Sequence, residues 1–182
     1  QGTVNDVLQG YNGTFFAYCE RGSGKTYTMM GADIQDDHTR GIIPRLTDQV
    51  FQGILHSPPT IEYTVKVSFM EIYMEKIRDL LAPDRINLPI QEDKSKGVRV
   101  KGLSEHYMSS PDEVYDVIRR GTGVRVVSAT RMNAESSRSH TIFTFTVQQR
   151  NTETGATKSG CLYLVDLAGS EKVDKTGASG QT

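Results

Sequence analysis

Three short segments carry the residue types that bind and sense a phosphate group. One is the glycine-rich run 22–26 (Gly-Ser-Gly-Lys-Thr), and the other two are 133–140 (Asn-Ala-Glu-Ser-Ser-Arg-Ser-His) and 166–171 (Asp-Leu-Ala-Gly-Ser-Glu). A glycine-rich loop before Lys-Thr cradles phosphates with backbone N–H groups, while serine hydroxyls and an aspartate after an apolar strand can reach a magnesium ion and its waters. Together the segments predict a nucleotide pocket that senses whether a terminal phosphate is present.

The segments on either side of the glycine-rich run are those that such a pocket needs. The apolar residues 13–18 are typical of a buried strand, and residues 25–30 can open a helix. The first turn of that helix offers unpaired N–H donors and the positive end of the helix dipole to phosphates. The order of strand, loop and helix therefore favours a phosphate-binding loop over a chance match.

Four residues then have expected roles in the pocket. Lys25 would add a compact charge at the β- and γ-phosphates, and Thr26 would give a hydroxyl ligand to magnesium. Asp166 ends an apolar strand that covers 161–165, so it is placed to hold a water of that ion. Gly169 offers a backbone N–H at close range to a γ-phosphate, where a Cβ would obstruct.

The rest of the chain alternates between helix and strand signals. Helix signals occur at 4–10, from Pro44 onward and at the capping box 110–113. Strand-like alternation occurs at 61–69 and 140–149, and a hairpin turn is expected at 151–156. Because strands and helices interleave and no repeat or low-complexity segment is present, we predict a single α/β domain with a layered sheet and helices on both faces.

Composition is that of an ordinary globular domain. The chain has 182 residues, of which 24% are charged and 36% hydrophobic, and its formal net charge is −1. It contains no apolar run of about 18 residues and no charged-then-apolar leader. Cys19 and Cys161 do not suggest a disulfide framework, so a reducing compartment fits. We therefore expect a cytoplasmic protein, with neither a membrane nor a nucleic acid as its partner.

The two downstream segments resemble a known family. Residues 133–140 and 166–171 closely resemble the two switch motifs of kinesin motor domains, and 162–171 matches that family nearly residue for residue. The resemblance extends over essentially the whole chain and is greatest to the conventional, cargo-transporting branch, with 132–135 similar to its fungal members. A myosin or G-protein relative is disfavoured because 166–171 fits neither family's second switch well.

This resemblance implies a fold, an activity and partners. It implies a three-layer phosphate-loop NTPase fold with a mixed, mostly parallel central sheet, in a motor that hydrolyses ATP with Mg²⁺ to move along microtubules. It also implies that residues 1–182 are a partial motor domain, truncated at both ends, without the opening strand or anything after the second switch loop. The parent protein would be a cytoskeletal homodimer joined through a coiled-coil stalk.

The resemblance also implies roles for residues of the two switches. Ser137 would contact magnesium or the γ-phosphate, and Ser136 would position the attacking water or relay a proton from it. Arg138 would pair with Glu171 when the pocket closes, although such a pair in loops is often solvated and contributes little. Asn133 would bond within the switch or to phosphate.

The full set of expected site residues follows from the loop and the resemblance together. Tyr27 stands where the family places a ring against adenine, with packing inside the protein as an equal alternative. The expected catalytic residues are Ser136, Ser137, Arg138, Gly169 and Glu171. The expected nucleotide-binding residues are Cys19, Glu20, Arg21, Gly22, Ser23, Gly24, Lys25, Thr26, Tyr27 and Asn133. The expected magnesium ligands are Thr26, Ser137 and, through a water, Asp166.

The phosphate loop departs from the family pattern at three adjacent positions. The family's loop begins Gly-Gln-Thr, whereas Cys19, Glu20 and Arg21 precede Gly22 here. A Cβ at a position that needs positive φ costs on the order of 1–2 kcal/mol, and Glu20 adds a negative charge near a polyphosphate. Arg21 could compensate by donating to phosphate oxygens. The departure is compatible with tolerated variation, with an error in the determined sequence, or with a divergence that weakens nucleotide binding. The alternative function is therefore a microtubule-binding kinesin-like protein with weakened or lost ATP turnover.

Two groups of basic residues could face a microtubule. The first group is Lys94, Lys96, Arg99 and Lys101, and the second is Lys172 and Lys175. Loop charges of this kind are usually solvated, and with the resemblance the two interpretations are about equal.

Overall fold

The structure is a computed structural model of the chain, and it describes residues 2–34, 36–94, 97–131 and 138–170. The helices in these ranges are α1 (Gly2–Leu8), α2 (Lys25–Met30), α3 (Ile42–Leu55) and α4 (Pro111–Arg131). The strands are β1 (Gly13–Ala17), β2 (Ile61–Tyr73), β3 (Lys76–Asp79), β4 (Ile90–Asp93), β5 (Gly97–Val100), β6 (His106–Met108), β7 (His140–Asn151) and β8 (Thr157–Asp166).

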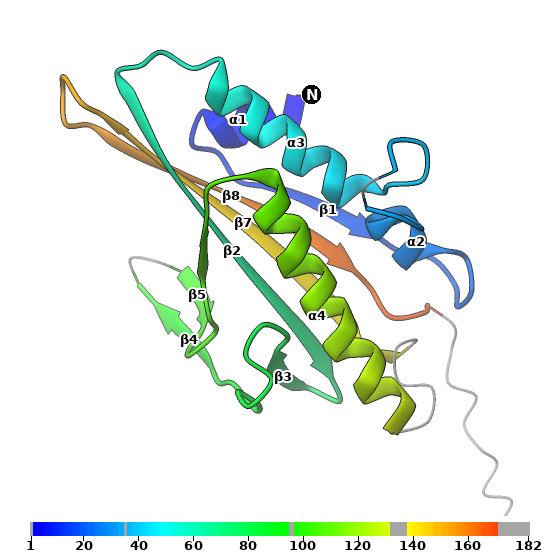
Figure 1. The fold of residues 1–182 in the computed structure, drawn as a ribbon. Helices are drawn as coiled ribbons and strands as arrows, with labels where there is room; N and C mark the ends of the chain where they lie inside the picture. Colours follow the sequence, from blue (N-terminus) through cyan, green and yellow to red (C-terminus); the bar gives the residue numbers. More distant parts are fainter. Residues whose placement is uncertain (1, 35, 95–96, 132–137, 171–182) are drawn as a thin grey trace, which may run out of the picture.

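A six-stranded mixed sheet forms the centre of the described chain (Figure 1). Its strand order is β1-β8-β7-β2-β3, with β6 paired to β2, while β4 and β5 form a separate hairpin. Among the described strands, only β1 and β8 run parallel, and the remaining pairs are antiparallel. The prediction of a mixed sheet is confirmed, but the prediction that it is mostly parallel is wrong.

Short hairpin connections explain two of the antiparallel pairs, β7–β8 and β2–β3. The chain turns from β7 into β8 through 152–156, as the sequence predicts, and from β2 into β3 through two residues. Those two residues, Met74 and Glu75, have φ values of 47° and 61°, which are the left-handed values of a tight hairpin turn. A connection this short can join only antiparallel strands.

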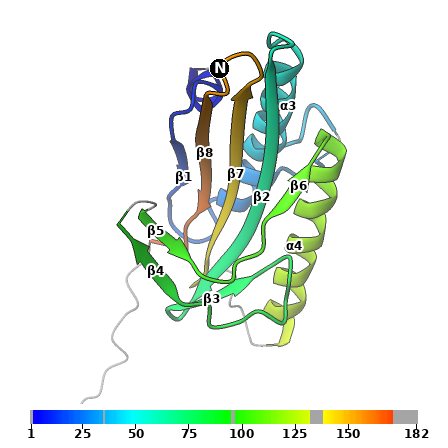
Figure 2. The same cartoon turned by 90° about the vertical axis from the view of Figure 1, so that its left-hand side faces the viewer.

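The described helices all cover one face of the sheet (Figure 2). A single apolar core lies between them and that face, with Val7 of α1, Met29 of α2, Val50 of α3 and Ile118 of α4 all packed in it. On the sheet side, the core takes alternate residues of β2, β7 and β8, such as Phe143. Within the described residues, the prediction of helices on both faces is therefore not met.

The other face of the sheet is open in the described part of the chain. The side chain of Phe16 is 65% exposed, so β1 is not the fully buried strand that its apolar run predicts. The strand alternates instead, with Phe15 packed against the core and Phe16 on the open face. An apolar hollow on this face is lined by Phe16, Ile142, Val165 and Leu167 among others.

The helix boundaries follow local chemistry. At the start of α4 the Glu113 N–H lies 3.4 Å from the Ser110 Oγ, as a capping box requires. In a capping box the Glu113 carboxylate would accept from the N–H of Ser110. Here it accepts instead from the N–H and the hydroxyl of Ser109, one residue earlier in the chain. None of the described helices has the length and apolar character that a membrane span needs.

Candidate nucleotide site

The glycine-rich loop connects β1 to α2 at the edge of the sheet. Because β1 runs parallel to β8, with Ala17 opposite Asp166, the loops that follow the two strands lie side by side. Backbone hydrogen bonds join them: the Leu167 N–H donates to the Ala17 carbonyl at 3.1 Å, and the Ser170 N–H donates to the Cys19 carbonyl at 3.2 Å. The parallel pair therefore brings two of the three predicted site segments together.

The turns of the glycine-rich loop fall on its glycines. Gly22 and Gly24 have φ values of 79° and 87°, which an L side chain rarely adopts. Cys19, Glu20 and Arg21 are not among the described non-glycine residues with positive φ. The predicted backbone strain at Cys19 is therefore wrong, because the left-handed turns lie at the two glycines that the chain keeps.

The Lys25 side chain folds back over the loop. Its Nζ donates to the carbonyl oxygens of Cys19 and Glu20, at 2.7 Å each. The Ser23 hydroxyl donates to the same Glu20 carbonyl at 2.9 Å. These contacts use main-chain oxygens, so they do not depend on which side chains stand at positions 19 and 20.

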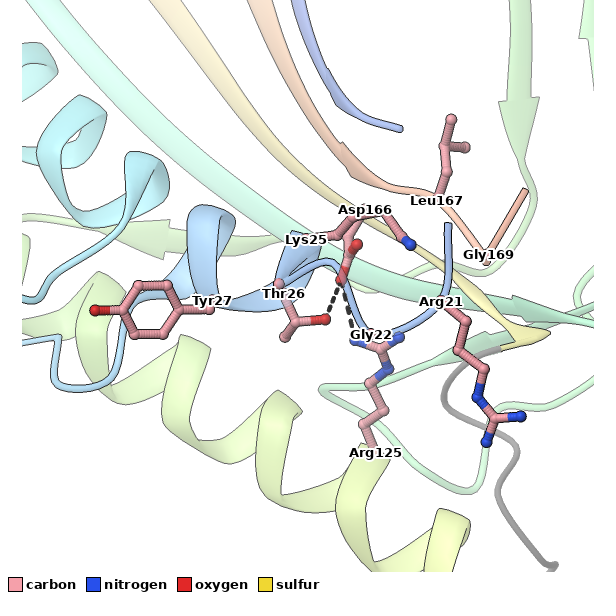
Figure 3. Close-up of a pocket in the computed structure, with 10 residues that line it drawn as sticks. Arg21, Gly22, Lys25, Thr26, Tyr27, Arg125, Asp166, Leu167 and Gly169 are labelled. Atoms are coloured by element: carbon pink, nitrogen blue, oxygen red, sulfur yellow. Dashed lines mark hydrogen bonds and ion pairs between the residues drawn. The ribbon is translucent and has the colours of Figure 1, made fainter. Parts of the chain in front are cut away.

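A cavity of about 380 Å³ opens beside the loop (Figure 3). It brings together eight of the predicted site residues: Arg21, Gly22, Gly24, Lys25, Thr26, Tyr27, Asp166 and Gly169. Figure 3 shows Thr26 turned toward Asp166, whereas the Tyr27 ring points away from both. That ring is 57% exposed, so in this structure it is not packed inside the protein.

Thr26 and Asp166 form a polar pair on the cavity wall. The Thr26 Oγ1 donates to the Asp166 Oδ2 at 2.6 Å. Asp166 is only 4% exposed, and within the described part of the chain its Oδ1 is buried without a hydrogen-bond partner. A buried carboxylate oxygen with no donor is a costly arrangement unless a cation or a water fills it. Hard oxygen donors of this kind fit Mg²⁺, which binds through few protein ligands and keeps several waters.

Arg125 is a site residue that the sequence reasoning missed. Its side chain, 10% exposed, extends from α4 to the same carboxylate, with Nη1 at 3.4 Å from the Asp166 Oδ2. Its Nε lies 3.5 Å from the Glu71 Oε1, and its Nη2 donates to the Ser139 hydroxyl at 3.4 Å. One signal in the sequence could have found it: at helical spacing, Arg125 lies on the same face of α4 as the apolar residue Val114.

The other predicted site residues that the structure describes do not line the cavity. Arg138 is exposed. Cys19, Glu20 and Ser23 lie in the same loop but do not line the cavity. The residues that lie outside the described ranges are Asn133, Ser136, Ser137 and Glu171, together with the basic residues Lys96, Lys172 and Lys175.

Comparison with known proteins agrees with the geometry. The family model "Kinesin motor domain" matches residues 1–182. The chain is 68% identical over 179 residues to the kinesin heavy chain of Syncephalastrum racemosum and 66% identical over 180 residues to that of Gibberella moniliformis. These matches cover 98% and 99% of the chain but 19% of each relative.

A solved structure gives the same result. It is described as "Structure of a fast kinesin: Implications for ATPase mechanism and interactions with microtubules". The TM-score is 0.94 at 64% identity, over 100% of this chain and 51% of that one.

The fold and the cavity, with a glycine-rich loop beside an aspartate at the end of a parallel strand, are those of the phosphate-loop class of proteins. With the family model matched over its whole length, the chain belongs to the kinesin motor domain family. The family predicted from 133–140 and 166–171 is therefore confirmed.

Proposed function

We propose that the protein containing this chain is a microtubule motor that hydrolyses ATP with Mg²⁺. The observation that carries the proposal is the pair formed by Thr26 of the phosphate loop and Asp166 at the end of β8, which leaves one carboxylate oxygen without a partner among the described residues. The relatives support it, because two are named kinesin heavy chains and the solved structure is described as a kinesin with an ATPase mechanism.

Nucleotide phosphates would bind over the glycine-rich loop. Gly22 and Gly24 present backbone without a Cβ at the cavity wall, and Lys25 lies beside them. The Lys25 ammonium would exchange the carbonyl oxygens of Cys19 and Glu20 for oxygens of the β- and γ-phosphates, which carry more charge. We also assign Arg21 as a phosphate donor at the cavity wall.

The metal would be held at the polar pair. The Thr26 hydroxyl would bind Mg²⁺ directly and Asp166 Oδ1 through a water, with Ser137 as a further ligand. The bound ion supplies charge neutralisation at the β- and γ-phosphate oxygens. Arg125 keeps the Asp166 carboxylate in place through a contact with the same Oδ2 that accepts from Thr26, since Arg125 is itself anchored to Glu71.

Hydrolysis would be coupled to movement through the two switches. Gly169 would donate its N–H to the γ-phosphate, Ser136 would position the attacking water or relay a proton from it, and Arg138 would pair with Glu171 on closure. Loss of the γ-phosphate would release both segments, a change of order that phosphate-loop switches use to signal outward. Asn133 would stabilise the first switch, and Tyr27 would lie against the adenine.

The microtubule contact is assigned in part to the β4–β5 hairpin. This hairpin stands apart from the main sheet (Figure 2) and exposes Lys94, Arg99 and Lys101. Exposed cations on a projecting element suit an acidic partner, whereas the whole chain, with a net charge of −1, has no general attraction. We further propose that the protein is cytoplasmic, microtubule-associated and homodimeric through a coiled-coil stalk.

A second candidate is a microtubule-binding relative that has lost turnover. It is favoured by one observation, the sequence Cys19-Glu20-Arg21 in the phosphate loop. The main-chain contacts of the loop argue against it, because they do not depend on the side chains at positions 19 and 20.

The two candidates are separated by measuring ATP turnover of the full-length protein, with and without microtubules. The matched variant restores the family pattern through Cys19→Gly, Glu20→Gln and Arg21→Thr. Microtubule-stimulated turnover by the natural sequence supports the motor. Turnover by the restored variant alone supports the second candidate, and no turnover by either protein refutes the motor proposal.

A further inference from the structure

His140 connects the two switch segments directly. It is the first residue of β7 and immediately follows the Ser-rich stretch of the first switch segment. Its Nδ1 accepts a hydrogen bond of 2.9 Å from the Ala168 N–H, in the loop that follows β8. The residue after Ala168 is Gly169, which lines the nucleotide cavity. A side chain of the first switch segment therefore holds the backbone of the second.

The bond takes the place of a missing strand contact. The β7–β8 pairing ends where Thr141 meets Asp166, so the chain beyond Asp166 has left the ladder. The Leu167 N–H is taken up by the Ala17 carbonyl of β1, and the Ser170 N–H by the Cys19 carbonyl. The imidazole of His140 accepts an N–H that lies between these two. A half-buried N–H needs such a partner, because leaving it unsatisfied is costly.

Three of the four N–H groups in 167–170 are thus held by the protein. Within the described residues, the fourth, that of Gly169, donates to no protein acceptor. Because the peptide plane at Ala168 is fixed from one side and that at Ser170 from the other, the Gly169 N–H between them has little freedom to reorient. A donor held in place before the ligand arrives costs less to order at the moment of reaction.

We propose that His140 is a positioning residue for ATP hydrolysis, which keeps the Gly169 N–H directed to the terminal phosphate by holding the neighbouring Ala168 peptide. This inference rests on the proposed function. It concerns a contact between the two switches that is separate from the expected pair of Arg138 and Glu171. The bond requires a neutral imidazole with its proton on Nε2, because a ring nitrogen that accepts an N–H cannot carry a proton itself.

The surroundings of His140 allow a matched pair of substitutions. His140 also lines the apolar hollow on the open sheet face, together with Ile142, Val165 and Leu167. Asparagine and leucine have nearly the same shape, and both place an atom where the imidazole has Nδ1. Only the asparagine oxygen can accept from the Ala168 N–H, whereas leucine suits the apolar hollow better. A purely structural role therefore favours His140→Leu, and a positioning role favours His140→Asn.

The test uses the full-length protein and measures microtubule-stimulated ATP turnover, ADP affinity and thermal melting for His140→Asn and His140→Leu. We expect His140→Asn to keep turnover within about threefold of the natural protein, and His140→Leu to lose about tenfold or more in kcat, the effect of one missing hydrogen bond. Affinity for ADP, which has no terminal phosphate, should be the same in both variants. The melting temperature of the leucine variant should be no lower than that of the asparagine variant.

Two results would overturn the inference. One is equal turnover by the leucine and asparagine variants, and the other is a loss of turnover that follows the melting temperature or the ADP affinity. His140→Ala, which removes the acceptor without adding bulk, provides the same comparison if the leucine variant does not fold. An absence of ATP turnover in the natural protein would instead refute the proposed function, and the role of His140 with it.

Discussion

Replacing Arg125 with methionine tests whether its guanidinium balances the buried carboxylate of the nucleotide site. The side chains of Glu71 and Asp166 are 8% and 5% exposed, so both charges lie away from water. Glu71 keeps a second cation, Arg78, after the substitution. Asp166 loses the cation that the described structure gives it, while methionine fills much of the same volume.

The expected cost is about 3 kcal/mol, because breaking a buried ion pair by removing one partner costs roughly 3–5 kcal/mol and leaves a buried charge uncompensated. We expect the lower end because the contacts are long, at 3.4 and 3.5 Å. The matched control is Arg119→Met on the same helix, whose exposed pair with Asp116 should contribute less than about 1 kcal/mol.

Hydrogen exchange is a suitable assay, because it measures local opening free energies of α4 and β8 within the full-length protein. Adding Asp166→Asn to Arg125→Met should recover much of the loss, since a neutral amide no longer needs the cation. Saturating Mg²⁺ and ADP should stabilise the methionine variant more than the natural protein, because the metal then supplies the missing positive charge. Equal effects of Arg125→Met and Arg119→Met, or no recovery in the double variant, would refute this account.

Three further outcomes follow from the loop and from α4. Gly24→Ala should destabilise the protein by about 1–2 kcal/mol, because φ is 87° there. Gly123→Ala, which has open space in the helix, should stabilise the protein by about 0.5–1 kcal/mol. Urea unfolding measures both changes, and changes in stability of the same sign for the two variants would contradict this reasoning. Cys19→Gly should give no stabilisation in the same assay, since Cys19 does not have positive φ; a clear gain would indicate strain at that position. The N–H and hydroxyl of Ser109 lower the pKa of Glu113 from its ordinary value of 4.5, so its stabilising contribution is present at neutral pH and lost as the pH falls through the lowered pKa. Melting of Glu113→Gln compared with the natural protein should therefore show a difference at neutral pH that vanishes in acid, and a constant difference would count against it.

The sequence predicts those parts of the fold that local chemistry determines. The strand, loop and helix around 22–26 lie at the expected places, as do the hairpin at 151–156 and the helix that follows Ser110. Each has a signal within a few residues, such as glycines before Lys-Thr or a serine three residues before a glutamate. Thr26 and Asp166 are expected at the same magnesium ion, but the hydrogen bond between them is not predicted by the sequence, because it depends on β1 and β8 being neighbours.

The features that were missed depend on contacts between distant segments or on unusual local residues. The β2–β3 turn uses Met74 and Glu75, which do not have the asparagine or glycine typical of such turns. An arginine on a helix is usually taken as solvent-exposed, so its spacing from Val114 is easily passed over, although α4 packs against β2 and Arg125 is buried there. The role of His140 in holding Ala168 likewise depends on where the β7–β8 ladder ends.

The main-chain bonding of the phosphate loop has a consequence for how such loops are found in sequences. The usual letter pattern for this motif requires a glycine at the position that Cys19 occupies, so a search by that pattern rejects this chain. The residues that shape the loop here are instead the two left-handed glycines, Gly22 and Gly24, and the lysine that clasps the carbonyls before them. Substitutions at 19–21 can therefore hide a phosphate loop from a pattern search while its backbone keeps the same course.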